Sequence, residues 1–248
     1  RLIKISDPEK NKKTLFIWPE GVFYESYLQD IEKYKNLFAD KFSENHLIIL
    51  GINNFNNNHG TDSQKYFNSL VLLNHKLEIL SLYNKVNLVP FGEYVPFADF
   101  WARFGVFGLA AQASGGYAPG PGAQLLSLSI GRALPLICYE AVFPQDVNAA
   151  PARPDYLLQI TNDAWFGSYS GPYQHLVQAR MRAAEQGLPM MRAANTGVSA
   201  MIGPRGQLLD SLALDEAGYV DSQLPVALPP TLYSRSGDWP MFLLTLLL

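Results

Sequence analysis

Short apolar runs, separated by polar and turn-forming residues, occur along most of the chain. Runs of about four to eight apolar residues that are bounded by Gly, Pro, Asn or Asp are typical of buried strands. Polar or Gly- and Pro-rich stretches at 53–64, 88–97 and 114–122 predict loops or irregular segments. The apolar runs predict strands at 15–18, 47–52, 67–73, 77–83, 125–130, 133–138, 156–160, 189–194, 198–202 and 218–224.

Two segments show helical spacing instead. Over residues 24–42 the large apolar side chains recur every three or four positions, which predicts one amphipathic helix. Residues 172–186 place Leu176 and several alanines on one face, and Gly187 follows as a helix-ending residue. Strands interleaved with two long helices favour a layered α/β domain over an all-β barrel.

Composition narrows the choice of partners and compartments. The formal net charge is −3 and 48% of the 248 residues are hydrophobic, so the chain can bury a sizeable core. A protein without a basic surface is a poor candidate for binding nucleic acid. The first residues lack the apolar stretch of a signal peptide. Cys138 is the only cysteine, so no internal disulfide is expected, and this leaves the compartment open.

The two ends of the chain differ in character. Residues 239–248 are apolar but too short to cross a bilayer, which takes about 20 residues. They are either the start of a transmembrane helix or a C-terminal core element. All lysines lie between Lys4 and Lys85, whereas every arginine except Arg1 lies at or after Arg103. We hypothesise that two parts of different base composition are joined near residues 86–102.

Three residues with reactive side chains lie at or just after the ends of predicted strands: Glu20, Lys85 and Cys138. A cysteine thiolate is a nucleophile, a glutamate can take its proton, and a lysine can stabilise an oxyanion. Each residue also has an ordinary explanation: a small buried hydrophobe, a turn residue and a solvated cation. From these residues alone, the sequence indicates only a possible Cys-dependent acyl transfer. The histidines form neither a Cys–His pair nor a metal-ligand spacing, so no metal or other cofactor is expected.

The sequence motifs around these residues resemble those of a known family. Trp18-Pro-Glu20, Lys85-Val-Asn87 and Cys138-Tyr-Glu140 occur in the order of the Glu–Lys–Cys signature of the nitrilase superfamily. Within that superfamily, several stretches resemble the bacterial apolipoprotein N-acyltransferases: Leu88-Val-Pro-Phe-Gly-Glu-Tyr-Val-Pro96, Thr161-Asn-Asp-Ala-Trp-Phe-Gly167 followed by Gln174-His-Leu176 and Ala179-Arg-Met-Arg-Ala183, and Arg192-Ala-Ala-Asn-Thr-Gly-Val-Ser199. The resemblance extends from about residue 14 to residue 248.

The resemblance implies an α/β fold, a four-layer α-β-β-α sandwich of the nitrilase type. It implies a catalytic domain over 1–238 that lacks its first strand, followed at 239–248 by the start of a C-terminal transmembrane helix. The expected location is the periplasmic face of the bacterial inner membrane, with the protein a monomer. The implied reaction is ping-pong: an acyl chain passes from a phospholipid to a cysteine thioester, and then to the N-terminal amine of a diacylglyceryl-apolipoprotein.

Residue roles follow from the same motif matches. Glu20 is the implied general base, Lys85 the oxyanion stabiliser and Cys138 the nucleophile. The implied supporting residues are Glu93, Tyr139 and Glu140. The implied lipid entrance contains Trp165 and Phe166, and the apolar segment 97–109 is expected either to join it or to pack in the core.

Two other functions remain open at this point. A soluble nitrilase-type amidase would use the same Glu, Lys and Cys, with water in place of the amine. A domain that binds lipid or a partner without chemistry would need none of them to react.

Overall fold

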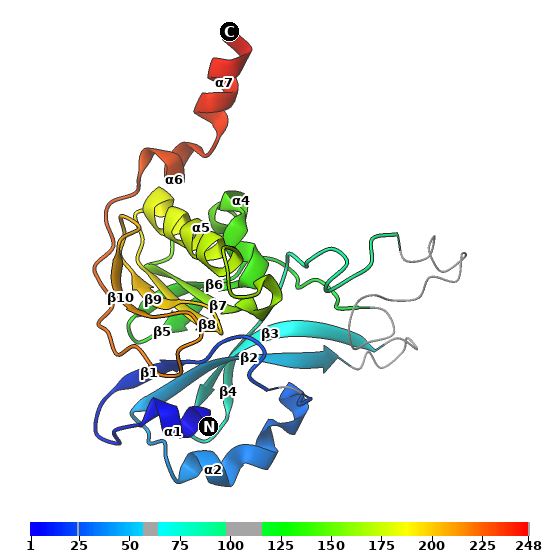
Figure 1. Ribbon diagram of the computed structural model, residues 1–248, viewed down its shortest axis with the longest axis vertical. Helices are drawn as coiled ribbons and strands as arrows, with labels where there is room; N and C mark the ends of the chain where they lie inside the picture. Colours follow the sequence, from blue (N-terminus) through cyan, green and yellow to red (C-terminus); the bar gives the residue numbers. More distant parts are fainter. Residues whose placement is uncertain (24, 57–63, 98–115, 248) are drawn as a thin grey trace. The chain divides into compact units, whose positions relative to one another are not determined.

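The computed structural model describes residues 1–248 except 24, 57–63, 98–115 and 248 (Figure 1). The chain forms two compact units. The first unit comprises Arg1–Asp7, Ile17–Glu20 and Ala123–Leu248. The second comprises Pro8–Phe16 and Gly21–Gly122.

A four-stranded sheet in the order β1-β2-β3-β4 organises the second unit. Its strands are β1 (Thr14–Ile17), β2 (His46–Asn56), β3 (Lys65–Asn74) and β4 (Ile79–Asn84). β2 and β3 pair antiparallel along their whole length, and β3 and β4 pair antiparallel as the predicted hairpin. Apolar runs at 48–52 in β2 and 70–73 in β3 make up most of the buried stretches of these strands, which accounts for their prediction from the sequence.

The predicted helix over 24–42 is wrong in its length and type. The structure has a 3-10 helix η1 (Leu28–Tyr34) followed by a short α-helix α2 (Lys35–Ala39). Tyr27 is extended and bridges to Asn53 of β2, so the helix cannot begin before Leu28. The predicted loop over 53–64 is wrong at its start, because residues 53–56 belong to β2. Pairing with β3 extends the strand to Asn56 despite its polar sequence.

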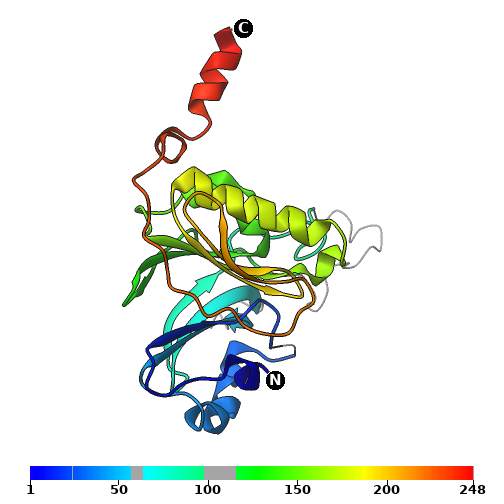
Figure 2. The ribbon, with the colours of Figure 1, turned by 60° about the vertical axis from the view of Figure 1, so that its left-hand side comes forward.

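A six-stranded mixed sheet in the order β10-β9-β8-β7-β6-β5 organises the first unit (Figures 1 and 2). β6, β7 and β8 are parallel, and the outer pairs are antiparallel. The strands are β5 (Leu126–Leu128), β6 (Gly131–Ile137), β7 (Tyr156–Asn162), β8 (Met190–Asn195), β9 (Ser199–Ile202) and β10 (Leu208–Leu212).

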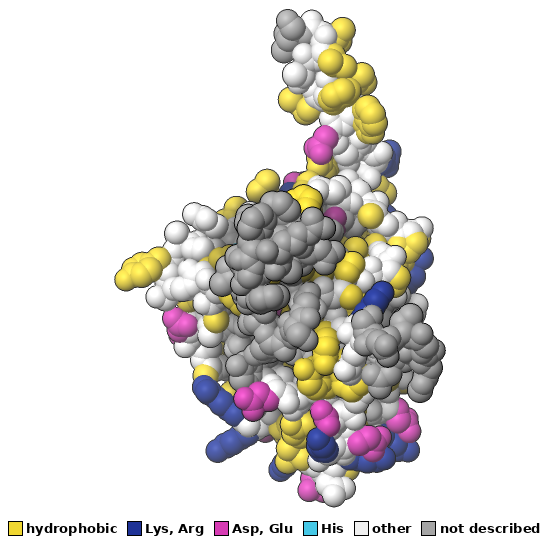
Figure 3. All heavy atoms as spheres, turned by 90° about the vertical axis from the view of Figure 1, so that its right-hand side faces the viewer, with side chains coloured by type: hydrophobic (Ala, Val, Ile, Leu, Met, Phe, Trp, Pro, Cys, Tyr) yellow, Lys and Arg dark blue, Asp and Glu magenta, His cyan; other side chains and the backbone are white. Residues whose placement is uncertain are grey.

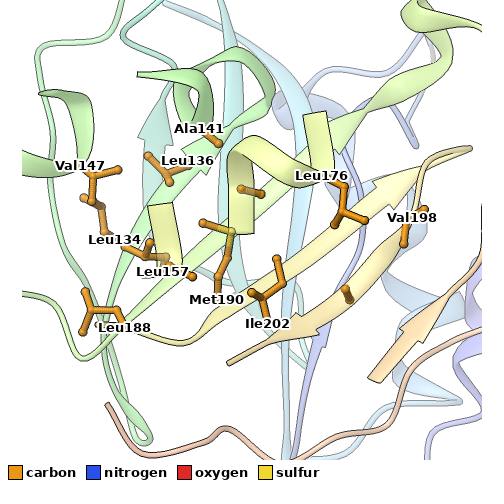
Figure 4. Packing of buried hydrophobic residues seen from close by; sticks show 13 residues of the cluster. Leu134, Leu136, Ala141, Val147, Leu157, Leu176, Leu188, Met190, Val198 and Ile202 are labelled. Carbon is orange, nitrogen blue, oxygen red and sulfur yellow. The ribbon is translucent and has the colours of Figure 1, made fainter. Parts of the chain in front are cut away.

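Helix α5 (Gly171–Gln186) covers one face of this sheet (Figure 2). Its inward side packs Leu176, Ala179 and Ala183 onto buried side chains of β6 to β9. Figure 4 shows the labelled members of this cluster, Leu176 among them. Gly187 ends the helix in the left-handed conformation (φ 64°), as predicted. The shorter helical elements are α1 (Leu2–Ser6), η2 (Cys138–Val142), α4 (Pro144–Asn148), η3 (Asp163–Phe166), α6 (Leu232–Ser236) and α7 (Trp239–Leu247).

One predicted strand is wrong and one observed strand was not predicted. Residues 218–224 form no strand, and most of them are exposed. The edge position belongs instead to β10, which pairs with β9. Most β10 side chains are exposed, so the strand lacks the apolar pattern on which sequence prediction depends.

The C-terminal residues form α7, and its apolar side chains are exposed, as the hydrophobic atoms on the helix at the top of Figure 3 show. Within the described ranges, no helix combines the length and apolar character needed to cross a membrane. Of the predicted apolar segment 97–109, only Phe97 lies among the described residues, and its side chain is exposed.

Candidate active site

The parallel strands of the first unit bring several polar residues to one sheet edge. Ile137 pairs with Ile160 between β6 and β7, and Asn162 pairs with Asn195 between β7 and β8. The carboxyl ends of the three strands therefore meet, and residues that follow them lie close together. Cys138 follows β6 and Asp163 follows β7. Such an edge is where α/β proteins commonly place their chemistry.

Cys138 has an unusual backbone conformation. Its φ is 50°, in the left-handed region that residues with a Cβ rarely adopt, and its side chain is buried. Two neighbours hold the turn that begins here. A carboxylate oxygen of Glu140 accepts a 2.7 Å hydrogen bond from the Ile137 backbone N–H, and the Tyr139 ring packs edge-on against Phe143. Strained residues of this kind cluster at functional sites.

A buried polar network lies directly behind the Cys138 backbone. The Cys138 carbonyl oxygen lies 3.2 Å from Nε2 of Gln159 and 3.2 Å from Nε2 of His175. His175 Nδ1 lies 2.9 Å from an oxygen of Asp163, and the other Asp163 oxygen accepts a 2.6 Å bond from Arg192. Arg192 also donates to the Gln159 side-chain oxygen at 2.5 Å. Gln159, His175, Asp163 and Arg192 thus form a closed ring of polar contacts, and two of them contact the Cys138 carbonyl group.

Asp163 is held as a carboxylate in this network. Burial by itself raises the pKa of Asp163, but the His175 hydrogen bond and the Arg192 charge outweigh it, and the pKa lies below its ordinary value of 3.8. The cation of Arg192 therefore has a charged partner although both side chains are fully buried.

The end of β7 also fixes Glu20. The backbone N–H of Asn162 donates a 2.8 Å hydrogen bond to a carboxylate oxygen of Glu20. Asn162 caps η3 as well, because its side-chain oxygen accepts from the Ala164 N–H at 3.3 Å. The residue that holds Glu20, Asn162, is thus the direct neighbour of Asp163 in the chain.

Lys85 belongs to the second unit, immediately after β4. Its side chain is 1% exposed, and its Nζ lies 2.9 and 2.8 Å from the two carboxylate oxygens of Glu93. Glu93 is held in turn by the Asn68 side chain and by the Val89 backbone N–H, each at 2.8 Å. The alternative of a solvated lysine is therefore wrong, and the structure places Glu93 directly against Lys85.

The two aromatic residues of the predicted lipid entrance are both exposed. Trp165 is 70% and Phe166 is 45% exposed, on η3. The Phe166 ring packs edge-on against His175 at 5.5 Å between ring centres, so this exposed residue touches the buried network. Among the described residues, no three His, Cys, Asp or Glu side chains are grouped so as to hold a metal ion.

Gly197 has no side chain, and the Asp163 carboxylate occupies the space that a Cβ would take. A Cβ at this position would lie 2.1 Å from an Asp163 carboxylate oxygen. We expect Gly197→Ala to push that carboxylate off Arg192 and to lower the free energy of unfolding by about 1–3 kcal/mol. Denaturant unfolding followed by tryptophan fluorescence measures the loss. Gly218→Ala is the matched control, because its added Cβ meets only a flexible leucine side chain, and an equal loss there would contradict this account.

Sequence reasoning missed the network itself. Asp163, His175 and Arg192 stand inside motifs that carried the family resemblance, but Gln159 does not. The structure places Nε2 of His175 against the Cys138 carbonyl oxygen, and no residue pattern signals such a backbone contact.

The chain is similar to known proteins over most of its length. A sequence family described as carbon–nitrogen hydrolase matches residues 7–228. A relative named apolipoprotein N-acyltransferase from Bradyrhizobium diazoefficiens is 40% identical over 94% of this chain and 44% of its own length. One of the same name from Brucella suis biovar 1 is 37% identical over 96% of this chain and 44% of its own. These relatives confirm the resemblance seen in the motifs, and the chain spans less than half of their length.

Solved structures match as well. The amidase from Nesterenkonia sp. aligns over 99% of this chain and 87% of its own, with a TM-score of 0.59 and 20% identity. A carbon–nitrogen hydrolase from Helicobacter pylori aligns over 81% of this chain and 73% of its own, with a TM-score of 0.55 and 16% identity. At such identities the likeness concerns the fold, and with the family match it confirms the predicted α/β sandwich of the nitrilase type.

Proposed function

Because the chain belongs to the carbon–nitrogen hydrolase family, we propose that it carries the catalytic machinery of an apolipoprotein N-acyltransferase. The observation that carries this proposal is the 40% identity to a relative of that name, which extends over 94% of the chain. The identity is twice that to the amidase of known structure. The substrates of this protein are then a phospholipid that gives an acyl chain and a diacylglyceryl-apolipoprotein whose terminal amine takes it.

In the first half-reaction, the Cys138 sulfur attacks the ester carbonyl of the phospholipid. Glu20 takes the thiol proton, and the carbonyl oxygen becomes an oxyanion in a tetrahedral intermediate. The intermediate collapses by breaking the ester C–O bond. The leaving alkoxide takes the proton from Glu20, which yields a lysophospholipid and a thioester on Cys138.

In the second half-reaction, the lipoprotein amine attacks the thioester carbonyl. Glu20 accepts the proton that the amine loses, and the thiolate of Cys138 leaves and is reprotonated. Lys85 stabilises the oxyanion in both halves, and Glu93 compensates its charge when no substrate is bound. Tyr139 and Glu140 hold the turn on which Cys138 stands.

A lipid donor also requires apolar contact at the membrane. We assign this role to the exposed side chains of Trp165 and Phe166 and to the exposed apolar helix α7, which fits the start of a membrane anchor. In this proposal the protein acts as a monomer at the periplasmic face of the bacterial inner membrane.

The test is the mass of the intact protein after incubation with phosphatidylethanolamine in detergent. The chain is expressed together with the sequence that flanks it in its gene, beside the Cys138→Ala variant. We expect a mass gain of one acyl chain on the unmutated protein only, and its loss when a diacylglyceryl-peptide with a free amine is added. Turnover of a small amide without any adduct would instead support the amidase, and neither adduct nor turnover would support a non-catalytic domain.

A further inference from the structure

Two side chains that are distant in sequence contact the carbonyl oxygen of Cys138, a residue with a strained backbone. Gln159 comes from β7 and His175 from α5, yet both place Nε2 3.2 Å from the Cys138 carbonyl oxygen. All three residues are buried. None of the steps in the proposed reaction uses Gln159 or His175, so their contact with this carbonyl needs its own explanation.

The orientation of the Gln159 amide is fixed by Arg192. Its oxygen accepts a 2.5 Å hydrogen bond from the guanidinium, which can only donate. The Gln159 nitrogen must therefore be the atom that faces Cys138. One of its two N–H groups reaches the carbonyl oxygen, and His175 Nε2 lies 3.4 Å from the same nitrogen.

Asp163 fixes the orientation of His175 in the same way. The Asp163 carboxylate can only accept, so Nδ1 of His175 carries a proton. Nε2 then accepts from Gln159 in the neutral ring or donates to the Cys138 carbonyl in the charged ring. In both states the carbonyl oxygen has at least one buried donor, and Arg192 ties the two supports together through Asp163 and Gln159.

We propose that Gln159 and His175, oriented by Arg192 and Asp163, are positioning residues that hold the Cys138–Tyr139 peptide in the geometry needed for attack. This inference rests on the proposed role of Cys138 as the nucleophile. In a trans peptide the C=O and the following N–H point in opposite directions. The hydrogen bond to the Cys138 oxygen therefore turns the Tyr139 N–H away from the network and fixes the plane of this peptide, that is, ψ of Cys138 and φ of Tyr139.

The contact can be tested without any substrate. Labelling with [13C′]cysteine and [15N]tyrosine gives a signal for the Cys138–Tyr139 peptide in an HNCO spectrum, since Cys138 is the only cysteine of the 248 residues. Gln159→Glu keeps the size of the side chain but replaces the donor by an acceptor. We expect this variant to shift the Cys138 carbonyl signal upfield. Gln186→Glu is the matched control, because Gln186 is also buried but donates to Asn148, and its signal stays in place.

The role in positioning is tested by the rate of acylation, with phosphatidylethanolamine and separately with p-nitrophenyl butyrate. We expect Gln159→Glu to lower the maximal acylation rate about 100-fold with both donors, because small displacements of reacting groups have effects of this size. The donor concentration at half-maximal rate should change by less than about threefold, since ground-state binding is not affected. Gln186→Glu should leave both quantities unchanged.

A second variant keeps the inference testable if Gln159→Glu fails to fold. His175→Phe retains an aromatic ring beside Phe166 but removes both nitrogen atoms, and His46→Phe is its control, because His46 is equally buried but contacts Ser43 and Glu9. An unmoved carbonyl signal, or a moved signal with an unchanged acylation rate, would overturn the inference. Acylation by p-nitrophenyl butyrate that Gln159→Glu slows, without any acylation by phosphatidylethanolamine, would contradict the proposed lipid donor and support the positioning role.

Discussion

Lys85→Met is expected to lower acyl transfer by about 10²–10³-fold, the usual effect of removing one stabiliser of an oxyanion. It should also destabilise the fold by about 3–5 kcal/mol, because Glu93 would be left as a buried carboxylate without its cation. Initial rates of acyl transfer and denaturant unfolding in detergent measure the two effects.

Loss of stability alone could explain a loss of activity, so the two effects must be separated. The double variant Lys85→Met/Glu93→Gln removes both charges and keeps most of the size of the pair. We expect it to recover a large part of the stability but none of the activity. Lys33→Met is the matched control on the surface, because Lys33 pairs with Asp30 in an exposed salt bridge, and it should change neither quantity. Recovery of activity in the double variant would show that Lys85 has only a structural role.

The sequence predicted the parts of the fold that depend on continuous apolar runs. β7 and the middle of β2 are buried on both faces, so most of their side chains are apolar. Helix α5 was predictable because its small apolar residues share one face and Gly187 ends it. The edge strand β10 and the polar end of β2 could not be predicted, because their strand conformation depends on backbone pairing with a neighbour.

In the candidate site, too, some residues could be predicted from the sequence and others could not. Glu20, Lys85 and Cys138 could be chosen because each lies at or just after the end of a predicted strand and matches a motif. Gln159 could not, because it stands inside an apolar strand where a lone polar residue has no recognisable partner. Its importance appears only when Arg192 and the Cys138 carbonyl are brought to it by β8 and by the end of β6.

The buried pair of Asp163 and Arg192 gives the second large effect. Asp163→Asn keeps the shape of the side chain but leaves Arg192 as a buried cation without a charged partner. We expect the free energy of unfolding at neutral pH to fall by about 3–5 kcal/mol, measured by denaturant unfolding. Asp155→Asn removes the acid of an exposed Asp–Arg pair and is the matched control, with an expected change of about 1 kcal/mol or less.

The pH dependence of this loss identifies its cause. The pKa of Asp163 is lower in the folded protein than its ordinary value of 3.8, so its contribution to stability is fully present above that value and is lost as the pH falls through the folded-state pKa. The difference in stability between the unmutated protein and Asp163→Asn should therefore be constant near neutral pH and shrink in strong acid. If the difference in the free energy of unfolding were the same at neutral pH and in strong acid, packing rather than the charge on Asp163 would stabilise this site.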